Sequence, residues 1–296
     1  MRYVKPCFLL LVFVLWLPAA LAAEPLRIFT VNYPLQYFAE RIAGEHAEVV
    51  FPAPADVDPA FWMPDSETVS AYQRADLILL NGAGYAKWTE RVSLPGLRTV
   101  DTSRGFRQNY LLADAGPTHS HGPSGDHSHA GIAFTTWLDF TQAAEQARAI
   151  LRALERRRPE LKEVFTANFE RLEQELNDLD RRLSRVGQKL TDQALLASHP
   201  VYQYLAGRYR LNLHSLMWEP DMSPSAEEWG RLRSMLKQHP ARWMLWEDEP
   251  IPATLARLQA LGVSPLVFSP GANRPAQGDF MGLMRQNIAE LERVLL

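Results

Sequence analysis

The stretch ELKEVFTANFERLEQELNDLDRRLSRVGQK, from Glu160 to Lys189, contains no proline and no glycine before Gly187. Its apolar residues recur at steps of three or four, which predicts one helix with one apolar face. At 1.5 Å per residue that helix would be roughly 45 Å long. A helix of this length is also compatible with a coiled coil, but it stands alone between two segments of another pattern. We therefore interpret it as the element that joins two lobes. The stripe comprises Leu161, Val164, Phe165, Phe169, Leu172, Leu176, Leu179, Leu183 and Val186.

On both sides of this helix the sequence alternates short β-type runs with helical spacing. Such alternation predicts an α/β fold in which helices cover a parallel sheet. Before the helix we expect strands at 26–32, 47–51, 75–81 and 97–100, and helices at 33–44, 66–74 and 137–154. After it we expect strands at 194–198, 211–216, 243–246 and 265–268, and helices at 201–209, 225–237, 253–261 and 280–295.

The alternation gives a division of the chain. Residues 24–158 form a first lobe that includes a His-rich loop at 118–130, residues 159–190 form the linking helix, and residues 191–296 form a second lobe.

The amino terminus has the pattern of a signal peptide over residues 1–23. Arg2 and Lys5 are followed by an apolar run, Phe8–Leu17, which is too short to span a bilayer as a retained anchor. Small residues then predict cleavage after Ala22 or Ala23. The only cysteine lies inside this segment, so the exported chain would have neither disulfides nor thiolate ligands. We expect a periplasmic protein.

Composition excludes several classes of function. The net charge of −3 and the lack of a basic stripe do not suggest nucleic-acid binding. The sequence contains no His-Glu-x-x-His, no Gly-x-Ser-x-Gly and no phosphate-binding loop, so no enzyme class is indicated.

Four of the eight histidines fall in a short polar segment, as His119, His121, His127 and His129. Gly, Pro and Ser fill most of the rest, which predicts a solvated loop. Paired imidazoles on such a loop are typical of transition-metal binding, with zinc the first candidate. A polar linker is the alternative, and the pattern does not separate capture from transport, sensing or catalysis.

Several pieces, in their order along the chain, carry a resemblance to a known family. They are Val31-Asn-Tyr-Pro-Leu35, Val57-Asp-Pro-Ala-Phe-Trp-Met-Pro64, Ala75-Asp-Leu-Ile-Leu-Leu-Asn-Gly-Ala-Gly84, Thr135-Thr-Trp-Leu-Asp139, Ala197-Ser-His-Pro-Val-Tyr-Gln-Tyr-Leu-Ala-Gly-Arg-Tyr209, Glu249-Pro250 and Val267-Phe-Ser-Pro270. With the His-rich loop and long helix between them, the chain resembles the zinc/manganese-type substrate-binding proteins of bacterial ABC importers.

The resemblance implies two Rossmann-like lobes joined by one long rigid backbone helix. It implies a divalent cargo, zinc or else manganese or another transition metal, held in the cleft by one residue from each of four loops. The implied partners are a permease and its ATPase in the inner membrane, and we expect a monomer.

The sequence departs from the implied metal site at three of four positions. The third ligand is kept as His199, but Ala60, Thr135 and Ser269 stand where the other ligands are expected. Alanine cannot coordinate, and neutral hydroxyls are weak zinc ligands beside imidazole or carboxylate. For His199 itself the alternative is a hydrogen-bonded, partly buried histidine.

Carboxylates on nearby loops could replace the missing ligands. The acids on loops or strand ends that could face the cleft are Asp58, Glu219, Asp221, Glu247, Asp248 and Glu249, although each alone also fits a cap, a turn or a solvated acid. Of these we select Asp58, Glu219, Asp221 and Glu249 as the candidate replacement ligands. Nearby tryptophans either fill the lobe interface or line a cleft that takes an organic or chelated ligand.

Three functions follow as hypotheses. The first is metal delivery, most simply of zinc, to an ABC importer. The second is a metal-buffering chaperone or accessory protein that uses only the His-rich loop. The third is binding of an organic or chelated ligand in a cleft that has lost the usual metal site.

Overall fold

The structure is a computed structural model that describes residues 24–113, 119–120, 126–127 and 131–295. The predicted signal peptide, His121 and His129 lie outside these residues. Among the described residues, none of the helices combines the length and the apolar character needed to cross a membrane.

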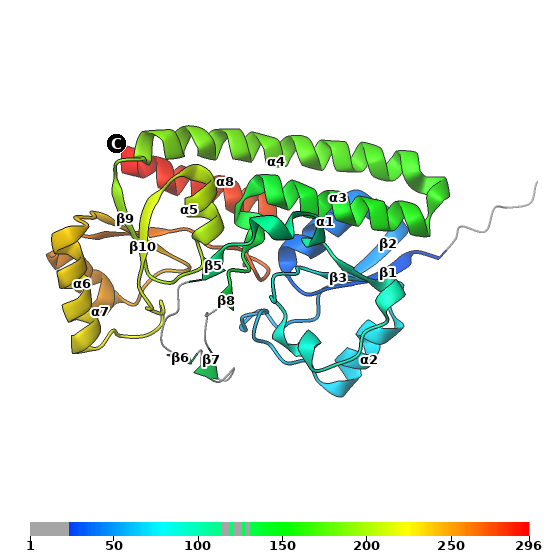
Figure 1. Cartoon of the computed structure of the whole chain (residues 1–296), viewed down its shortest axis with the longest axis horizontal. Helices are drawn as coiled ribbons and strands as arrows, with labels where there is room; N and C mark the ends of the chain where they lie inside the picture. Colours follow the sequence, from blue (N-terminus) through cyan, green and yellow to red (C-terminus); the bar gives the residue numbers. More distant parts are fainter. Residues whose placement is uncertain (1–23, 114–118, 121–125, 128–130, 296) are drawn as a thin grey trace, which may run out of the picture.

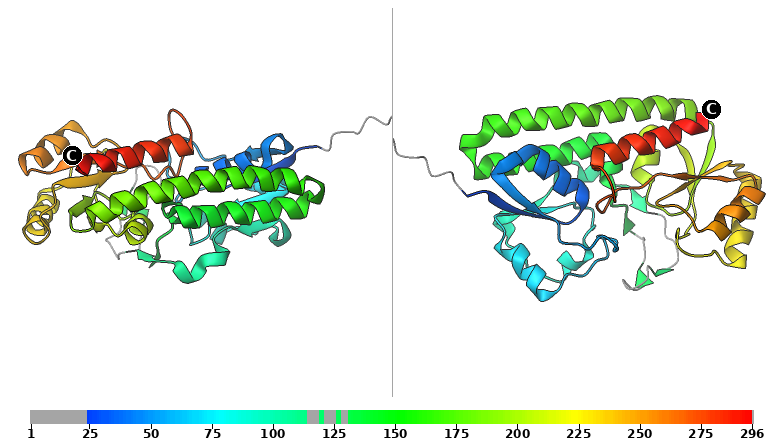
Figure 2. Two further views of the ribbon diagram at one scale, coloured as in Figure 1. Left: turned by 90° about the horizontal axis from the view of Figure 1, so that it is seen from above. Right: turned by 180° about the vertical axis from the view of Figure 1, so that it is seen from behind.

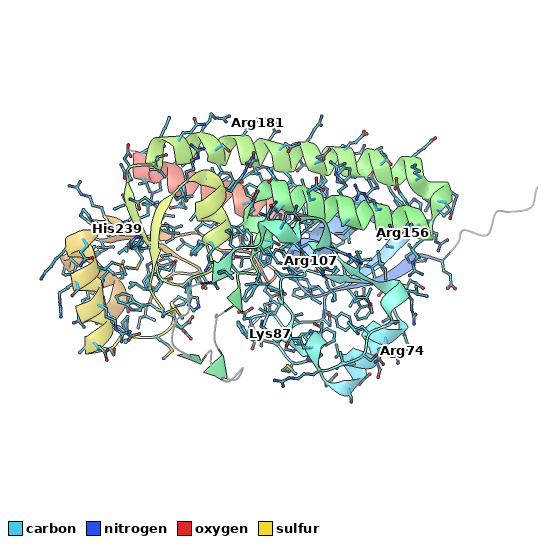
Figure 3. All side chains as sticks on the ribbon, in the orientation of Figure 1. Arg74, Lys87, Arg107, Arg156, Arg181 and His239 are labelled. Atoms are coloured by element: carbon cyan, nitrogen blue, oxygen red, sulfur yellow. The ribbon has the colours of Figure 1, made fainter. Side chains whose placement is uncertain are left out.

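The long helix α4 (Lys162–Leu190) runs along one side of the molecule over both lobes (Figure 1). The predicted apolar stripe is buried from Phe165 to Val186, whereas Arg181 projects from the solvent side (Figure 3). The first turn differs from the expectation in two details. Pro159 opens a short 3₁₀ turn, so the α-helix begins at Lys162, and Val164 is exposed because it lies beside the stripe and not on it.

The first lobe contains a parallel four-stranded sheet in the order β2-β1-β3-β4. Its strands are β1 (Leu26–Thr30), β2 (Ala47–Val50), β3 (Leu77–Leu80) and β4 (Thr99–Asp101). Its helices are α1 (Tyr33–Ala43), α2 (Ser66–Arg74) and α3 (Phe140–Arg157). The side chains of Asn32, Asp65 and Asp139 cap these helices by accepting amide hydrogen bonds, which sets where each one starts.

The second lobe repeats this arrangement with the strand order β10-β9-β11-β12, again all parallel. Its strands are β9 (Ala194–Ala197), β10 (Asn212–Ser215), β11 (Trp243–Trp246) and β12 (Ser264–Val267). Its helices are α5 (Gln203–Tyr209), α6 (Ala226–Gln238), α7 (Pro252–Ala260) and α8 (Phe280–Glu292). The predicted two-lobed α/β fold with parallel sheets is confirmed.

Several boundaries differ from the sequence expectations for local reasons. The helix expected at 137–154 is a 3₁₀ turn, Thr136–Leu138, followed by α3, because Asp139 caps the amides of Thr141 and Gln142. The helix expected at 280–295 ends at Glu292 and continues as a 3₁₀ turn. Other 3₁₀ turns occupy Gly44–His46, Lys87–Glu90, Gly96–Arg98 and Arg104–Asn109.

Short strands also occur within and beside the His-rich segment. β5 (Leu112–Ala113) pairs with β8 (Gly131–Ile132), and β6 (His119–Ser120) pairs with β7 (Asp126–His127). The second ladder places His119 opposite His127. The predicted loop thus contains one short antiparallel pair of strands.

The chain returns from the second lobe to the first through residues 269–279, which we call the return segment. Asn273 donates to the carbonyls of Pro54 and Val57, at 2.6 and 3.0 Å, and α8 then lies beneath α4 (Figure 2). Glu175 on α4 binds Arg41 of α1 and Arg285 of α8. The two lobes are thus tied by more than the long helix.

Gly187 on α4 lets this helix pack directly against the end of α5. A Cβ at this position would overlap the carbonyl oxygen of Tyr209 at the end of α5. We expect Gly187→Ala to lower the free energy of unfolding by about 1–3 kcal/mol, because the backbones must separate. Urea titration measures this.

The matched control is Gly230→Ala on α6, where an added Cβ would meet no atom. That change should raise the free energy of unfolding by about 0.5–1 kcal/mol, the ordinary gain of alanine over glycine inside a helix. If Gly187→Ala and Gly230→Ala changed the free energy of unfolding equally, the close contact between Gly187 and Tyr209 would be contradicted.

Candidate functional site

A cleft of about 680 Å³ lies between the lobes. Asp58, Tyr85 and Thr135 line it from the first lobe, and Glu219, Glu247 and Ser269 line it from the second. In parallel α/β sheets, ligands bind beyond the carboxyl ends of the strands, where the strand order reverses. In the second lobe that point lies between β9 and β11, which end just before His199 and Glu247.

His199 is buried at this point, with 1% of its surface exposed. Its Nδ1 lies 3.1 Å from Oε1 of Glu219, whose side chain is 10% exposed. Because a carboxylate accepts, this pairing favours the neutral tautomer with the proton on Nδ1 and the lone pair on Nε2. A carboxylate behind an imidazole is the arrangement that orients histidine ligands of metals.

Three acidic side chains act on His199. Burial alone would lower the pKa of His199, but the hydrogen bond to Glu219 and the charges of Glu247, Glu219 and Asp58 outweigh it. The pKa of His199 is therefore raised above its ordinary value. Carboxylates from both lobes thus lie within electrostatic reach of one imidazole.

This shift predicts how the stability of the metal-free protein depends on pH. A raised folded-state pKa means that the protonated ring stabilises the fold. That contribution is complete below the unfolded-state pKa of about 6.5 and is lost as pH rises through the folded-state pKa. The loss has a slope of at most about 1.4 kcal/mol per pH unit.

Urea titrations between pH 6 and 8.5 measure this slope, and the variant His199→Gln should lack it. A wild-type free energy of unfolding that rises through this range, with no difference from the variant, would contradict the assignment to His199.

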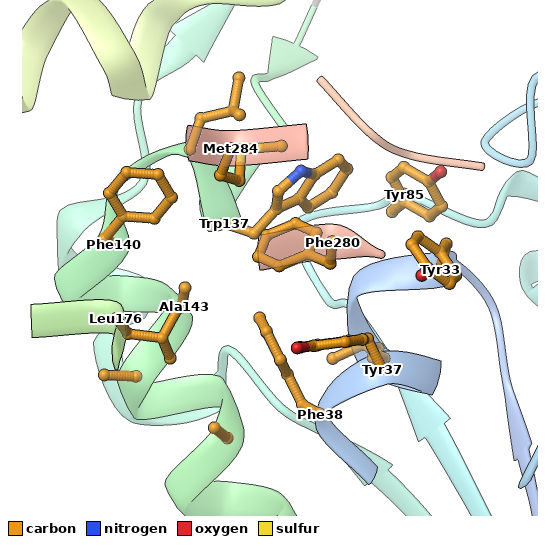
Figure 4. Packing of buried hydrophobic residues seen from close by; sticks show 14 of the residues in the cluster. Tyr33, Tyr37, Phe38, Tyr85, Trp137, Phe140, Ala143, Leu176, Phe280 and Met284 are labelled. Carbon is orange, nitrogen blue, oxygen red and sulfur yellow. The ribbon is translucent and has the colours of Figure 1, made fainter. Parts of the chain in front are cut away.

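Tyr85 brings a buried hydroxyl to the cleft. Its ring packs against Phe134 and Trp137 at centroid distances of 5.3 and 5.6 Å, and the hydroxyl points away from Trp137 (Figure 4). The residue is 1% exposed, and its hydroxyl has no hydrogen-bond partner among the described residues. Burial, and then the charge of Asp58, raise the pKa of Tyr85 well above its ordinary value.

The local backbone explains how Tyr85 reaches this place. After β3 the chain turns through Gly82 and Gly84, whose φ angles of 77° and 67° lie in the left-handed region that favours glycine. Gly82 also approaches Asp101 and Ser103 too closely for a Cβ. The turn at Asn81–Gly84 therefore ends β3 and places Tyr85 beside the cleft.

The positions of the expected family ligands contain no good donor. Ala60 is fully buried and its amide donates to Asp58 Oδ1 at 2.8 Å. The Thr135 hydroxyl donates to the carbonyl of Val201 at 2.5 Å. Ser269 lines the cleft, and its backbone amide and carbonyl pair with the side chain of Asn287.

The structure separates the four carboxylates that the sequence suggested as replacements. Asp58 and Glu219 line the cleft. Asp221 is exposed and is not part of the cleft lining. Glu249 is also exposed and lines a neighbouring pocket of about 310 Å³ between β12 and α8. Glu247, which the sequence also offered, lines the cleft.

The described residues contain no group of three or more His, Cys, Asp or Glu side chains placed to hold a metal ion. Of the four histidines of the His-rich segment, the backbones of His119 and His127 face each other across β6 and β7. His121 and His129 lie outside the described residues.

Two parallel α/β lobes of the same strand order, one long helix and an interlobe cleft give the chain the architecture of a two-lobed binding protein. Sequence comparison gives the particular class, the metal-binding proteins of ABC uptake systems. Residues 28–294 match the family model described as zinc-uptake complex component A, periplasmic, and the chain belongs to this family. The resemblance seen in the sequence is confirmed, and this is a family of solute-binding transport proteins, not of enzymes.

The chain is similar to the high-affinity zinc uptake system protein ZnuA of Bacillus subtilis (strain 168), with 25% identity over 293 residues. This match covers 92% of the chain and 88% of the relative. It is 23% identical to the zinc-binding lipoprotein AdcA of Streptococcus pneumoniae (strain R6), covering 90% of the chain but 55% of that protein. The crystal structure of the metal-dependent lipoprotein YcdH from Bacillus subtilis shares the fold, with a TM-score of 0.78, 21% identity and coverage of 92% and 100%.

Proposed function

We propose that this chain is a periplasmic protein that binds zinc and delivers it to an ABC importer. It is exported by the signal peptide at residues 1–23, acts as a monomer, and docks on a permease that an ATPase drives. His199 contacts the metal in the cleft, and the histidines of the His-rich segment collect it at the surface.

The observation that carries this proposal is the pairing of buried His199 with Glu219 at the switch point of the second sheet. A carboxylate behind an imidazole orients the ring for metal binding, and Nε2 is the atom through which His199 would contact zinc. The net acidic surroundings, with Glu247 and Asp58 nearby, favour a cation.

The donor types also bear on which metal is bound. Imidazole suits zinc, whereas carboxylates suit harder ions such as manganese. Among the described residues the cleft combines the imidazole of His199 with carboxylates, so manganese is the first competitor to test.

Calorimetric titration of residues 24–296, stripped of metal, tests the proposal. We expect one tight class of zinc sites, and the same titration with manganese should show weaker binding. A dissociation constant for zinc weaker than about 10 μM would contradict a delivery function.

A second candidate is a metal-buffering or accessory protein that binds metal only through the His-rich segment. Two observations favour this second function. Ala60 is buried and cannot coordinate a metal, and the Thr135 hydroxyl already donates a hydrogen bond to the carbonyl of Val201. Deleting residues 118–130 separates the two functions. If delivery through the cleft is correct, zinc binding that depends on His199 should persist after the deletion. Loss of all zinc binding would favour buffering.

A further inference from the structure

The hydroxyl of Thr135 makes a hydrogen bond from the first lobe to the second. Its Oγ1 donates to the carbonyl of Val201 at 2.5 Å. Thr135 is 4% exposed, and both residues line the cleft, so the bond lies in the cleft wall where little water competes for it. A position at which a metal ligand is expected thus contributes a contact between the lobes.

The backbone around Thr135 explains why its hydroxyl turns to the other lobe. Thr135 precedes the 3₁₀ turn Thr136–Leu138, and its carbonyl accepts the amide of Leu138 at 3.1 Å. A threonine before a helix commonly uses its hydroxyl to accept an amide hydrogen bond from the first turn. Thr135 makes no such cap. Its side chain instead serves the carbonyl of Val201.

Val201 ends the turn that carries His199. The amide of Val201 donates to the carbonyl of His199 at 3.0 Å, which closes a three-residue turn around Pro200. Before this turn the backbone is held by the sheet, because the amide of Ser198 donates to the carbonyl of Leu245 at 2.8 Å. The sheet thus fixes the start of the turn, and the bond from the first lobe acts on its end.

Helix α5, which follows the turn, is also fastened to the first lobe. The hydroxyl of Tyr204 donates to the carbonyl of Ala133 at 3.0 Å, and the hydroxyl of Tyr209 accepts the amide of Phe140 at 3.2 Å. These bonds remain when the Thr135 hydroxyl is removed. Its loss should therefore loosen the turn without separating the lobes.

The turn decides where the imidazole of His199 stands relative to the first lobe. Within the second lobe the ring is held by Glu219, whose Oε1 lies 3.1 Å from Nδ1. Groups that orient a histidine ligand without touching the metal typically change metal affinity by about 10–100-fold. A side chain that fixes the backbone of this histidine belongs to the same class of groups.

We propose that Thr135 is a positioning residue for His199. Its hydroxyl fastens the turn His199–Val201 to the first lobe and so sets the place of the imidazole against the first-lobe wall of the cleft. This inference rests on the proposed function, because it concerns how the histidine that contacts the metal is held.

Zinc calorimetry on variants of residues 24–296 tests this role at the class of sites that depends on His199. Thr135→Val keeps the shape of the side chain but loses the hydroxyl, so zinc affinity should fall by about tenfold. Thr135→Ser keeps the hydroxyl and should keep the affinity. The matched control is Thr136→Val. Thr136 is fully buried, but its hydroxyl donates to Gln146 within the first lobe, at 3.3 Å, so zinc affinity should not change.

A second measurement needs no metal. The ring of His199 is 1% exposed and its Nδ1 is paired with Glu219, so the Nδ1 proton should exchange slowly with solvent and give a resolved NMR signal. The variant His199→Gln assigns this signal by its disappearance. We expect a sharp signal in the wild type, in Thr135→Ser and in Thr136→Val. In Thr135→Val the signal should shift or broaden, because the turn no longer fixes the ring.

The outcomes separate positioning from simple stability. If Thr135→Val and Thr136→Val behave alike in both measurements, the inference is overturned, since the hydroxyl of Thr135 then has no particular effect on His199. Unchanged zinc affinity and an unchanged NMR signal in Thr135→Val would also overturn it, but would leave zinc delivery standing. If the wild type binds no zinc, the proposed function fails, and the NMR comparison still decides whether Thr135 positions His199.

Discussion

Replacing His199 by alanine should weaken the affinity of the cleft for zinc by about 100-fold. One protein ligand to zinc contributes roughly 3 kcal/mol, a quarter of the value of a complete structural site, and each 1.4 kcal/mol is a factor of ten. The substitution also leaves the nearly buried Glu219 carboxylate without its imidazole. Competition against a coloured zinc chelator measures the change.

The control for this substitution is His214→Ala. His214 belongs to the same lobe but is exposed on β10, where it stacks on His239. Its loss should leave zinc affinity unchanged. If His199→Ala is equally silent, the cleft does not contact the metal, and the buffering function through the His-rich segment becomes the better explanation.

Replacing Trp137 by alanine should lower the free energy of unfolding by about 3–5 kcal/mol. The indole is fully buried in the packed cluster that Figure 4 shows, between α1, α3 and α8. Removing a large aromatic side chain leaves a cavity that the surroundings fill only in part. The indole nitrogen also donates to the carbonyl of Pro270 at 2.7 Å. Without the indole, this buried carbonyl in the return segment would lose its hydrogen-bond donor.

Two further variants separate these contributions in urea titrations. Trp137→Phe keeps an aromatic ring but loses the donor, and it should cost about 1–3 kcal/mol. Trp62→Ala removes the same side chain at a partly exposed position and should cost less than Trp137→Ala. Equal losses at positions 62 and 137 would contradict the role given to the buried indole.

The fold could be predicted because its signals are local. The steps of three and four in α4, and the alternation of buried strands with helices, follow from which face each element buries. The errors lie at element ends. A 3₁₀ turn before α3 and a late start of α4 depend on the Asp139 cap and on Pro159, whose effects extend over one turn only.

The site was less predictable because it is assembled from distant loops. His199 and the loss of donors at Ala60 and Thr135 were visible in the sequence. The pairing of His199 with Glu219 depends on how the loops after β9 and β10 fold together. Glu247 was visible in the sequence as one of several acids at strand ends, but nothing local distinguished it from Glu249, two residues further on. Nothing local marks the Tyr85 hydroxyl as unpartnered, because only packing shows it.

The larger of two hydrophobic clusters among the described residues extends through both lobes, and the smaller one lies within the second lobe. The larger cluster extends from Ile28 in the first sheet, through Leu176 of α4, to Leu245 in the second sheet and Ile288 of α8. The lobes look like repeats, yet neither is a self-sufficient module, because each would expose the faces that α4, α8 and the return segment now cover. If the chain is divided at α4 and the two halves are expressed separately, each half should be insoluble. A chimaera that takes one lobe from a relative must also take the faces of α4 and α8 that pack against that lobe.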